Sequence, residues 1–144
     1  MDPRKKENKD ILNARVKFRE SFRPFAPIVL RKNASEYFDM DIDSKYMLMV
    51  FDVKKTNVIP AVTHVDNSAR VQTLSKKDNP ELYNLLEHFY KITSVPVLLN
   101  TSFNIAGEPI VETYEDAVNC FLTTNIDGMI LENYYIEKKK CDKI

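Results

Sequence analysis

Val95-Pro-Val-Leu-Leu-Asn-Thr-Ser-Phe-Asn104 joins a short apolar run directly to a polar segment. Uninterrupted apolar residues over 95–99 are typical of a strand that is covered on both faces. Ligands of open α/β sheets bind beyond the carboxyl ends of such strands, so we expect the polar side chains to face a ligand. These side chains are Asn100, Thr101, Ser102 and Asn104. The competing interpretation is a polar turn whose side chains satisfy their own backbone.

Helical and extended patterns alternate on both sides of this segment. Pro24 and Pro27 keep the residues before them out of the helical region, which favours an extended segment there. The remaining elements are predicted as a helix over 9–17, an extended segment over 25–30, helical turns over 34–40, a buried strand over 46–53, an alternating strand over 61–73 and a final strand over 128–136.

Two helices have clear starts in the sequence. For the helix over 79–92, Asn79 serves as N-cap and Pro80 fits the first helical position, with apolar residues at helical spacing behind them. Thr113-Tyr-Glu-Asp116 resembles a capping box before a second amphipathic helix. The fold class is therefore α/β, with helices packed on a twisted sheet. Some connections between strands are short, so we expect the sheet to be mixed.

Length and charge restrict the function classes. A chain of 144 residues fits one domain over 1–144, and we expect its charged ends, 1–8 and 138–144, to fray. The 21 basic and 21 acidic residues cancel, which makes nucleic acid an unlikely partner and does not indicate an anionic membrane. No apolar run reaches the roughly 20 residues that a spanning helix needs, and no targeting peptide is recognisable. We expect no membrane partner and a cytoplasmic location.

The spacing of cysteines and histidines and the small number of glycines restrict the possible metal and phosphate sites. Cys120 and Cys141 lack a CxxC partner, and neither His64 nor His88 has a second histidine at metal-ligand spacing, so no metal site is predicted. We expect Cys120 to be buried, Cys141 to be a tail thiol and His88 to lie on the surface. The chain has only two glycines, so phosphate recognition must come from side chains rather than from a glycine-rich loop.

Two segments supply such side chains. Lys17, Arg19 and Arg23 alternate with phenylalanines, and the prolines nearby restrict the backbone that carries these cations. An arginine fork and a lysine point charge together suit a phosphorylated ligand, although a solvated basic face above core aromatics also fits. Strand alternation would place His64 and Arg70 on one face, together with Asp66 and Ser68, as part of a site or as a structural polar network.

Four motifs, taken in their order along the chain, resemble the carboxy-terminal domain of the NodU/CmcH-type carbamoyltransferases. The resemblance extends over residues 2–136, and four ordered motifs are more specific than any one of them. The motifs are Asp2-Pro-Arg4, Asn13-Ala-Arg-Val-Lys-Phe-Arg-Glu-Ser-Phe-Arg-Pro-Phe-Ala-Pro27, Pro60-Ala-Val-Thr-His-Val-Asp-Asn-Ser-Ala-Arg-Val-Gln-Thr73 and Val95-Pro-Val-Leu-Leu-Asn-Thr-Ser-Phe-Asn-Ile-Ala-Gly-Glu-Pro-Ile-Val111.

The resemblance implies a YrdC-like α/β fold and one half of an O-carbamoyltransferase reaction. ATP, with Mg as its counterion, and carbamoyl phosphate would form carbamoyl-adenylate, and an amino-terminal, actin-like acceptor domain with its own metal would transfer the carbamoyl group to a hydroxyl. Carried over residue by residue, the catalytic set is Lys17, Arg23, Arg70 and Ser102. The residues expected to contact substrate are Arg19, His64, Asn100, Thr101 and Asn104.

This chain departs from the family pattern at several points. Asn67 and Ser94 stand where the family usually has glycine, which affects two turns. The acceptor domain is absent from the sequence, so we expect no complete transfer by this chain alone, and the acceptor substrate and oligomeric state stay open. Two other functions are retained: a non-catalytic anion-binding module that docks on a partner acceptor domain, and RNA binding, which the zero net charge disfavours.

Overall fold

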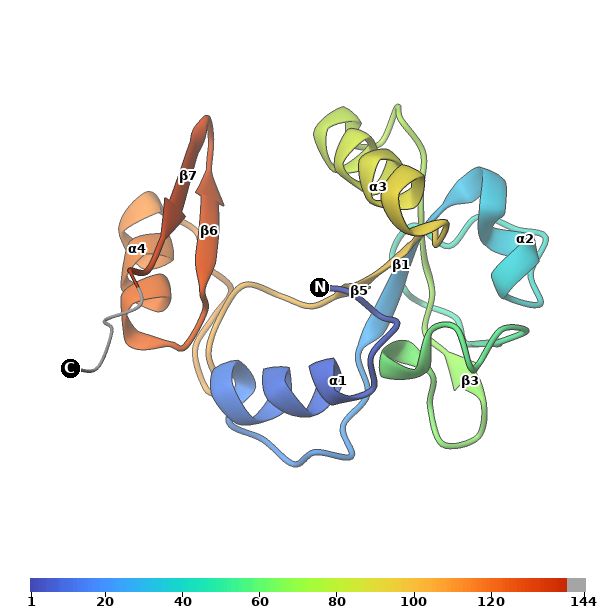
Figure 1. The fold of residues 1–144 in the computed structure, drawn as a ribbon, viewed down its shortest axis with the longest axis horizontal. Coiled ribbons are helices and arrows are strands. Elements are labelled where there is room, and N and C mark those ends of the chain that lie inside the picture. Colours follow the sequence, from blue (N-terminus) through green and yellow to red (C-terminus); the bar gives the residue numbers. More distant parts are fainter. Residues whose placement is uncertain (140–144) are drawn as a thin grey trace. The chain divides into compact units, whose positions relative to one another are not determined.

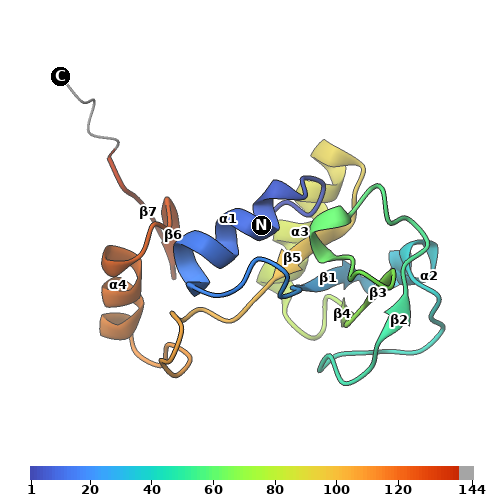
Figure 2. The same ribbon diagram turned by 90° about the horizontal axis from the view of Figure 1, so that it is seen from below.

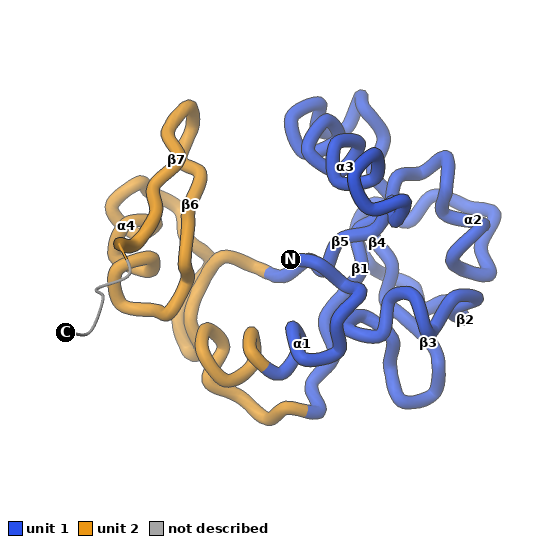
Figure 3. The backbone as a smooth tube through the Cα atoms, in the orientation of Figure 1, with its two compact units in different colours: residues 1–10, 22–101 blue, residues 11–21, 102–144 orange. Residues whose placement is uncertain are grey.

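The structure of the chain is a computed structural model, which describes residues 1–139. Its internal contacts divide the chain into two compact units (Figure 3). Unit 1 contains residues 1–10 and 22–101, and unit 2 contains residues 11–21 and the chain from residue 102 onward. A single domain over 1–144 stays a prediction.

Unit 1 is built on a three-stranded mixed sheet in the order β4-β1-β5. The central strand β1 (Ala26–Leu30) has all five residues buried. It pairs in parallel with β4 (Gln72–Leu74) and antiparallel with β5 (Val97–Asn100). The predicted α/β class, the mixed sheet and the strand near 95–99 are confirmed.

Helix α3 (Pro80–Thr93) covers one face of this sheet. Leu86, fully buried, packs against Ile28, Leu30 and Leu74 in the core. The predicted N-cap is confirmed, because the Asn79 side chain accepts a hydrogen bond of 2.9 Å from the backbone N–H of Leu82. This cap satisfies one of the N–H groups that the first turn of a helix leaves unpaired.

The start of the chain is held to the sheet, contrary to the fraying predicted for residues 1–8. The amino terminus of Met1 donates to the Leu99 carbonyl at 3.0 Å, and the Leu99 N–H donates to the Met1 carbonyl at 2.8 Å. The Pro3 carbonyl accepts from the Ala61 N–H at 3.1 Å. Backbone pairing with β5 thus outweighs the charge of this segment, which continues into α1 (Glu7–Leu12). Residues 140–144 of the other predicted frayed end lie outside the described residues.

The long buried strand predicted over 46–53 is wrong. Only β2 (Phe51–Asp52) forms there, antiparallel to the two-residue strand β3 (Ser68–Ala69). Met47 has a positive φ of 55°, which interrupts the extended backbone. Tyr46, Leu48 and Val50, here called the apolar row, are 77%, 83% and 56% exposed. Apolar character alone therefore did not distinguish a covered strand from an uncovered segment.

The alternating strand predicted over 61–73 is also divided. It becomes the 3₁₀ turn η3 (Pro60–Val62), a tight turn over 64–67, and the strands β3 and β4. Asn67 reverses the chain with a φ of 63°. The helical turns predicted over 34–40 are present as η2 (Arg31–Asn33) and α2 (Ala34–Tyr37).

Unit 2 packs α4 (Tyr114–Thr123) against the hairpin of β6 (Gly128–Leu131) and β7 (Tyr134–Glu137) (Figure 1 and Figure 2). The single final strand predicted over 128–136 is therefore wrong, because the chain turns back at 132–133, where Glu132 has a φ of 51°. The capping box is confirmed, with the Thr113 side chain and the Asp116 side chain each accepting from the other's backbone N–H. Cys120 is buried, as predicted.

The last residues of α1 lead into η1 (Asn13–Lys17), a single turn of π-helix in unit 2. The helix predicted over 9–17 is thus confirmed in position. No helix within residues 1–139 is long and apolar enough to cross a membrane.

Candidate functional site

Unit 2 brings three predicted site residues together around one cation. The Lys17 ammonium donates to the carbonyl and hydroxyl of Ser102 at 2.7 and 3.2 Å, and to the carbonyl and side-chain oxygen of Asn104 at 2.9 and 2.7 Å. Only 6% of the Lys17 surface is exposed. We call Lys17, Ser102 and Asn104 the Lys17 cluster.

The π-helical turn directs Lys17 inward. Its wider winding ends at Phe18, which adopts a left-handed conformation with a φ of 46°. Asn13, fully buried at the start of the turn, accepts a hydrogen bond of 2.7 Å from the Arg19 guanidinium. Single π-helical turns are frequent at functional sites because they re-aim side chains that a regular helix would place elsewhere. The local backbone therefore fixes both Lys17 and Arg19.

The charge of Lys17 is not neutralised by the groups it binds. Its four acceptors are carbonyl, amide and hydroxyl oxygens, all of them neutral. Burial lowers the pKa of the Lys17 ammonium, and the Arg19 guanidinium lowers it further, while Cys120 acts in the opposite direction. A buried cation with neutral partners and a second cation nearby favours an anionic ligand.

The loop after β5 is held by its own side chains as well. The Ser102 hydroxyl donates to the Asn104 side-chain oxygen at 2.5 Å, and the Asn104 amide donates to the Glu108 carbonyl at 2.9 Å. Ser102 stays exposed. The loop thus surrounds the Lys17 ammonium and leaves one hydroxyl accessible to a ligand.

Unit 1 brings together a second group, which we call the relay: Asp66, Ser68 and His64. The Ser68 hydroxyl lies 2.6 Å from Asp66 Oδ1 and 3.0 Å from His64 Nδ1. Asp66 Oδ1 also accepts from the Ser68 backbone N–H at 3.1 Å. The sequence analysis predicted that these side chains share one face of a strand. That prediction is wrong, because the turn over 64–67 brings them together.

The hydrogen-bond partners of Ser68 determine which atoms of the relay carry protons. Hydrogen bonds from the Ser68 hydroxyl and N–H lower the pKa of Asp66, so its carboxylate only accepts, and the single hydroxyl proton of Ser68 goes to Asp66. Ser68 must then accept from His64, which places the ring proton on Nδ1. In the neutral ring, Nε2 carries the lone pair. Burial, with the Arg70 charge, lowers the pKa of His64, while Asp66 raises it.

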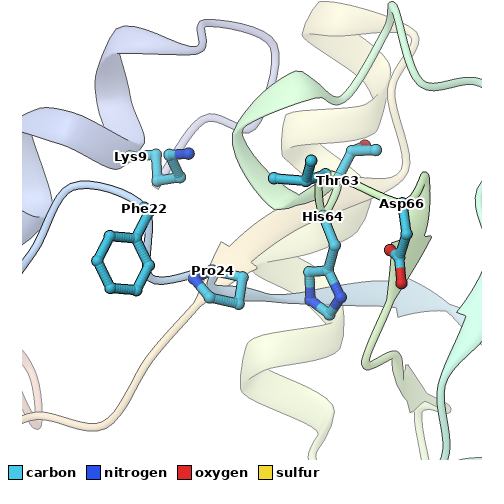
Figure 4. A pocket seen from close by; sticks show the side chains of 7 residues that line it. Lys9, Phe22, Pro24, Thr63, His64 and Asp66 are labelled. Atoms are coloured by element: carbon cyan, nitrogen blue, oxygen red, sulfur yellow. The ribbon is translucent and has the colours of Figure 1, made fainter.

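A pocket of about 400 Å³ in unit 1 is lined by this histidine and by Asp66. Lys9, Phe22 and Pro24 form other parts of its wall. Figure 4 shows the His64 ring between Pro24 and Asp66. Its Nδ1 edge is occupied by Ser68, so Nε2 is the edge available to a ligand.

Other predicted site residues lie elsewhere in unit 1. Arg23 is exposed before β1, and Arg70 is exposed between β3 and β4. Thr101 is exposed after β5. The Asn100 amide is already used inside the sheet, where it donates to the Gln72 side-chain oxygen at 2.6 Å.

Sequence reasoning did not assign a role to four residues near these clusters. Asn13 and Phe22 lie in the motif over 13–27. An asparagine close to an arginine in that motif is a signal from which a role for Asn13 could have been predicted. Lys9 and Gln72 gave no such signal, because their roles depend on chain segments that are distant in sequence.

Comparison with known proteins gives the family of this chain. The family model described as the carbamoyltransferase C-terminus matches residues 1–138. The chain belongs to this family. It is 48% identical over 143 residues to nodulation protein NolO of Bradyrhizobium diazoefficiens, covering 96% of the chain and 26% of that protein. It is 35% identical over 130 residues to 3′-hydroxymethylcephem-O-carbamoyltransferase of Amycolatopsis lactamdurans, covering 90% of the chain and 25% of that protein.

This carbamoyltransferase C-terminal domain spans about a quarter of the length of these relatives. A third relative, nodulation protein U of Sinorhizobium fredii, is 42% identical over 103 residues, with 70% of the chain and 18% of that protein covered. Both departures from the family's glycines fall on left-handed backbone: Asn67 has a φ of 63° and Ser94 a φ of 59°. Glycine adopts this region without steric cost, so the glycine that the resemblance implies would fit both turns.

Proposed function

We propose that this domain binds carbamoyl phosphate and ATP with Mg²⁺, and condenses them to carbamoyl-adenylate. With one water, the carbamoyl–phosphate bond is cleaved and phosphate leaves. An oxygen of the resulting carbamate then forms a bond to the α-phosphorus of ATP as pyrophosphate leaves. The observation that carries the proposal is the buried Lys17 ammonium, whose charge meets only neutral acceptors.

The chemistry needs cations more than it needs a nucleophile from the protein. Both substrates are polyanions, so the attack on phosphorus requires neutralisation of charge that would repel the incoming oxygen. Lys17 and Arg19 would supply this charge in unit 2, and the Ser102 hydroxyl would orient an anionic oxygen by exchanging its hydrogen bond to Asn104 Oδ1 for one to the ligand. Arg23 and Arg70 are exposed arginines of unit 1 that would bind phosphate oxygens.

Transfer to an acceptor hydroxyl would require an additional domain, for which an actin-like acceptor domain upstream of a YrdC-like fold is the candidate. Two observations support such a partner. The chain spans only about a quarter of its relatives, one of which is named an O-carbamoyltransferase. The apolar row of Tyr46, Leu48 and Val50 is more than half exposed at each residue and would be covered by a docked domain.

A pyrophosphate-release assay tests the adenylation step. Wild-type chain is incubated with Mg²⁺, ATP and carbamoyl phosphate, and omission of either substrate provides the background rate. Release that depends on both substrates and disappears in Lys17→Met supports the proposal. Equal release without carbamoyl phosphate would indicate simple nucleotide hydrolysis and would contradict it. Arg15→Met, an exposed residue of the same π-helical turn, is the matched control and should keep the wild-type rate.

A further inference from the structure

The pocket of unit 1 has the size and the lining of a site for a small organic molecule. Its volume of about 400 Å³ lies within the range of ligand pockets in proteins. Phe22 and Pro24 supply flat apolar wall, and Lys9 supplies a cation. The Phe22 ring is 70% exposed, so a ring stacked on it would remove aromatic surface from water.

Beside the Lys9 ammonium, two side chains that line this pocket, His64 and Asp66, offer acceptors. His64 Nε2 carries a lone pair because the relay holds the ring proton on Nδ1. Asp66 uses Oδ1 for the hydroxyl and N–H of Ser68, which leaves Oδ2 for a ligand. Two fixed acceptors favour a ligand that brings two donors, and a carboxylate beside a ribose commonly accepts from its hydroxyls.

We propose that this pocket takes the nucleoside part of the nucleotide. The ribose hydroxyls donate to His64 Nε2 and Asp66 Oδ2, the base lies against Phe22, and the Lys9 ammonium attracts the phosphates. This inference rests on the proposed function, in which the domain binds ATP. The amide of carbamoyl phosphate also donates, but it offers no ring to Phe22 and fills little of 400 Å³.

The test compares ATP with 2′,3′-dideoxy-ATP, both with Mg²⁺, by calorimetric titration of the whole chain. We expect the wild type to bind ATP about 100-fold more tightly, the effect of two hydrogen bonds that are each worth about a factor of ten. His64→Phe keeps an aromatic ring but removes one of the two acceptors, so the ratio of the two dissociation constants should fall about tenfold. A histidine with only a structural role would weaken both nucleotides equally and leave that ratio unchanged. His88→Ala, on the exposed face of α3, is the matched control and should keep the wild-type ratio.

Carbamoyl phosphate is titrated into the same samples to separate the two proposals. Equal binding of the two nucleotides by the wild type overturns the ribose inference and leaves the proposed function standing. Binding of carbamoyl phosphate but not of ATP overturns both the inference and the nucleotide half of the proposed function. Loss of carbamoyl phosphate binding in His64→Phe, with no ribose preference in the wild type, would assign the pocket to the carbamoyl group instead.

A readout on the unmodified chain covers the case in which His64→Phe does not fold. Imidazole nitrogen spectra should show the proton of His64 on Nδ1, and ATP should shift the Nε2 resonance more than dideoxy-ATP does. A proton on Nε2 in the neutral ring would overturn the inference, because the pocket would then present a donor.

Discussion

The Lys17 cluster of unit 2 and the relay of unit 1 use the same neutral groups around opposite charges. In the Lys17 cluster, carbonyl and hydroxyl oxygens converge on a buried ammonium. In the relay, a hydroxyl and a backbone N–H converge on a carboxylate, and a histidine follows. The first arrangement keeps a net positive charge, whereas the second presents lone pairs. Clusters that use similar neutral groups thus favour different ligands: an anion in unit 2 and a hydrogen-bond donor in unit 1.

Removal of the central cation is the largest change that the comparison predicts. In Lys17→Met, four partly buried oxygens lose the ammonium as a donor, although Asn104 Oδ1 keeps the Ser102 hydroxyl, and acceptors left unsatisfied cost about 1–3 kcal/mol of unfolding free energy. We expect denaturant titration to show this loss. Arg15→Met should leave the midpoint unchanged. An unchanged midpoint in Lys17→Met would mean that the ammonium does not organise the loop.

Matched serine substitutions give the next largest effect on stability and distinguish the two clusters. Ser68 is buried and joins Asp66 to His64, so we expect Ser68→Ala to cost about 1 kcal/mol. Ser102→Ala should cost less than half as much, because Ser102 is exposed and its carbonyl still binds Lys17. Thermal or denaturant unfolding of the pair measures the difference. Equal losses would contradict the claim that the Ser68 hydroxyl contributes more to folding stability than the Ser102 hydroxyl does.

The two left-handed turns give a smaller effect of opposite sign. Ser94, at the end of α3, has a φ of 59° and a ψ of 18°, where a side chain is strained and glycine is not. Ser94→Gly should therefore stabilise the chain by about 1 kcal/mol or less, since glycine also costs entropy on folding. Asn67→Gly should gain less, because asparagine tolerates this region. A destabilised Ser94→Gly variant would show that the hydroxyl, rather than the backbone, matters there.

The pH dependence of His64 gives the smallest effect. Burial and the Arg70 charge lower its pKa below the usual 6.5, so the unfolded chain binds more protons than the folded chain near that value. The stability contribution of neutral His64 is thus present above pH 6.5 and is lost as the pH falls below it. Nitrogen spectra should give a midpoint below 6.5, and Arg70→Ala should raise it. A midpoint above 6.5 would show that Asp66 dominates instead.

How well the sequence predicts this molecule depends on the range of the interactions involved. Local signals were sufficient for α3 and α4, whose caps at Asn79 and Thr113 are made within one turn. Apolar character failed over 46–53, because it does not show whether another segment covers the apolar row. The chain reversal at 132 was missed as well, since a turn was not signalled by glycine or proline there.

For the candidate site, the residue types were predictable but their partners were not. Lys17, Ser102 and Asn104 were predicted as site residues, yet their mutual hydrogen bonds join positions 85 and 87 residues apart. The relay was predicted as a row on a strand, whereas a turn brings Asp66 and Ser68 together. Asn100 was expected to face a ligand, but its amide is used by Gln72 on another strand. Long-range pairing of this kind is decided by the tertiary fold.

The most direct test of the central claim is a calorimetric titration of carbamoyl phosphate into the wild-type chain and into Lys17→Met, at a temperature where both are folded. We expect saturable binding by the wild type and by Arg15→Met, and no measurable binding by Lys17→Met. Equal affinity of the wild type and Lys17→Met for carbamoyl phosphate would contradict it.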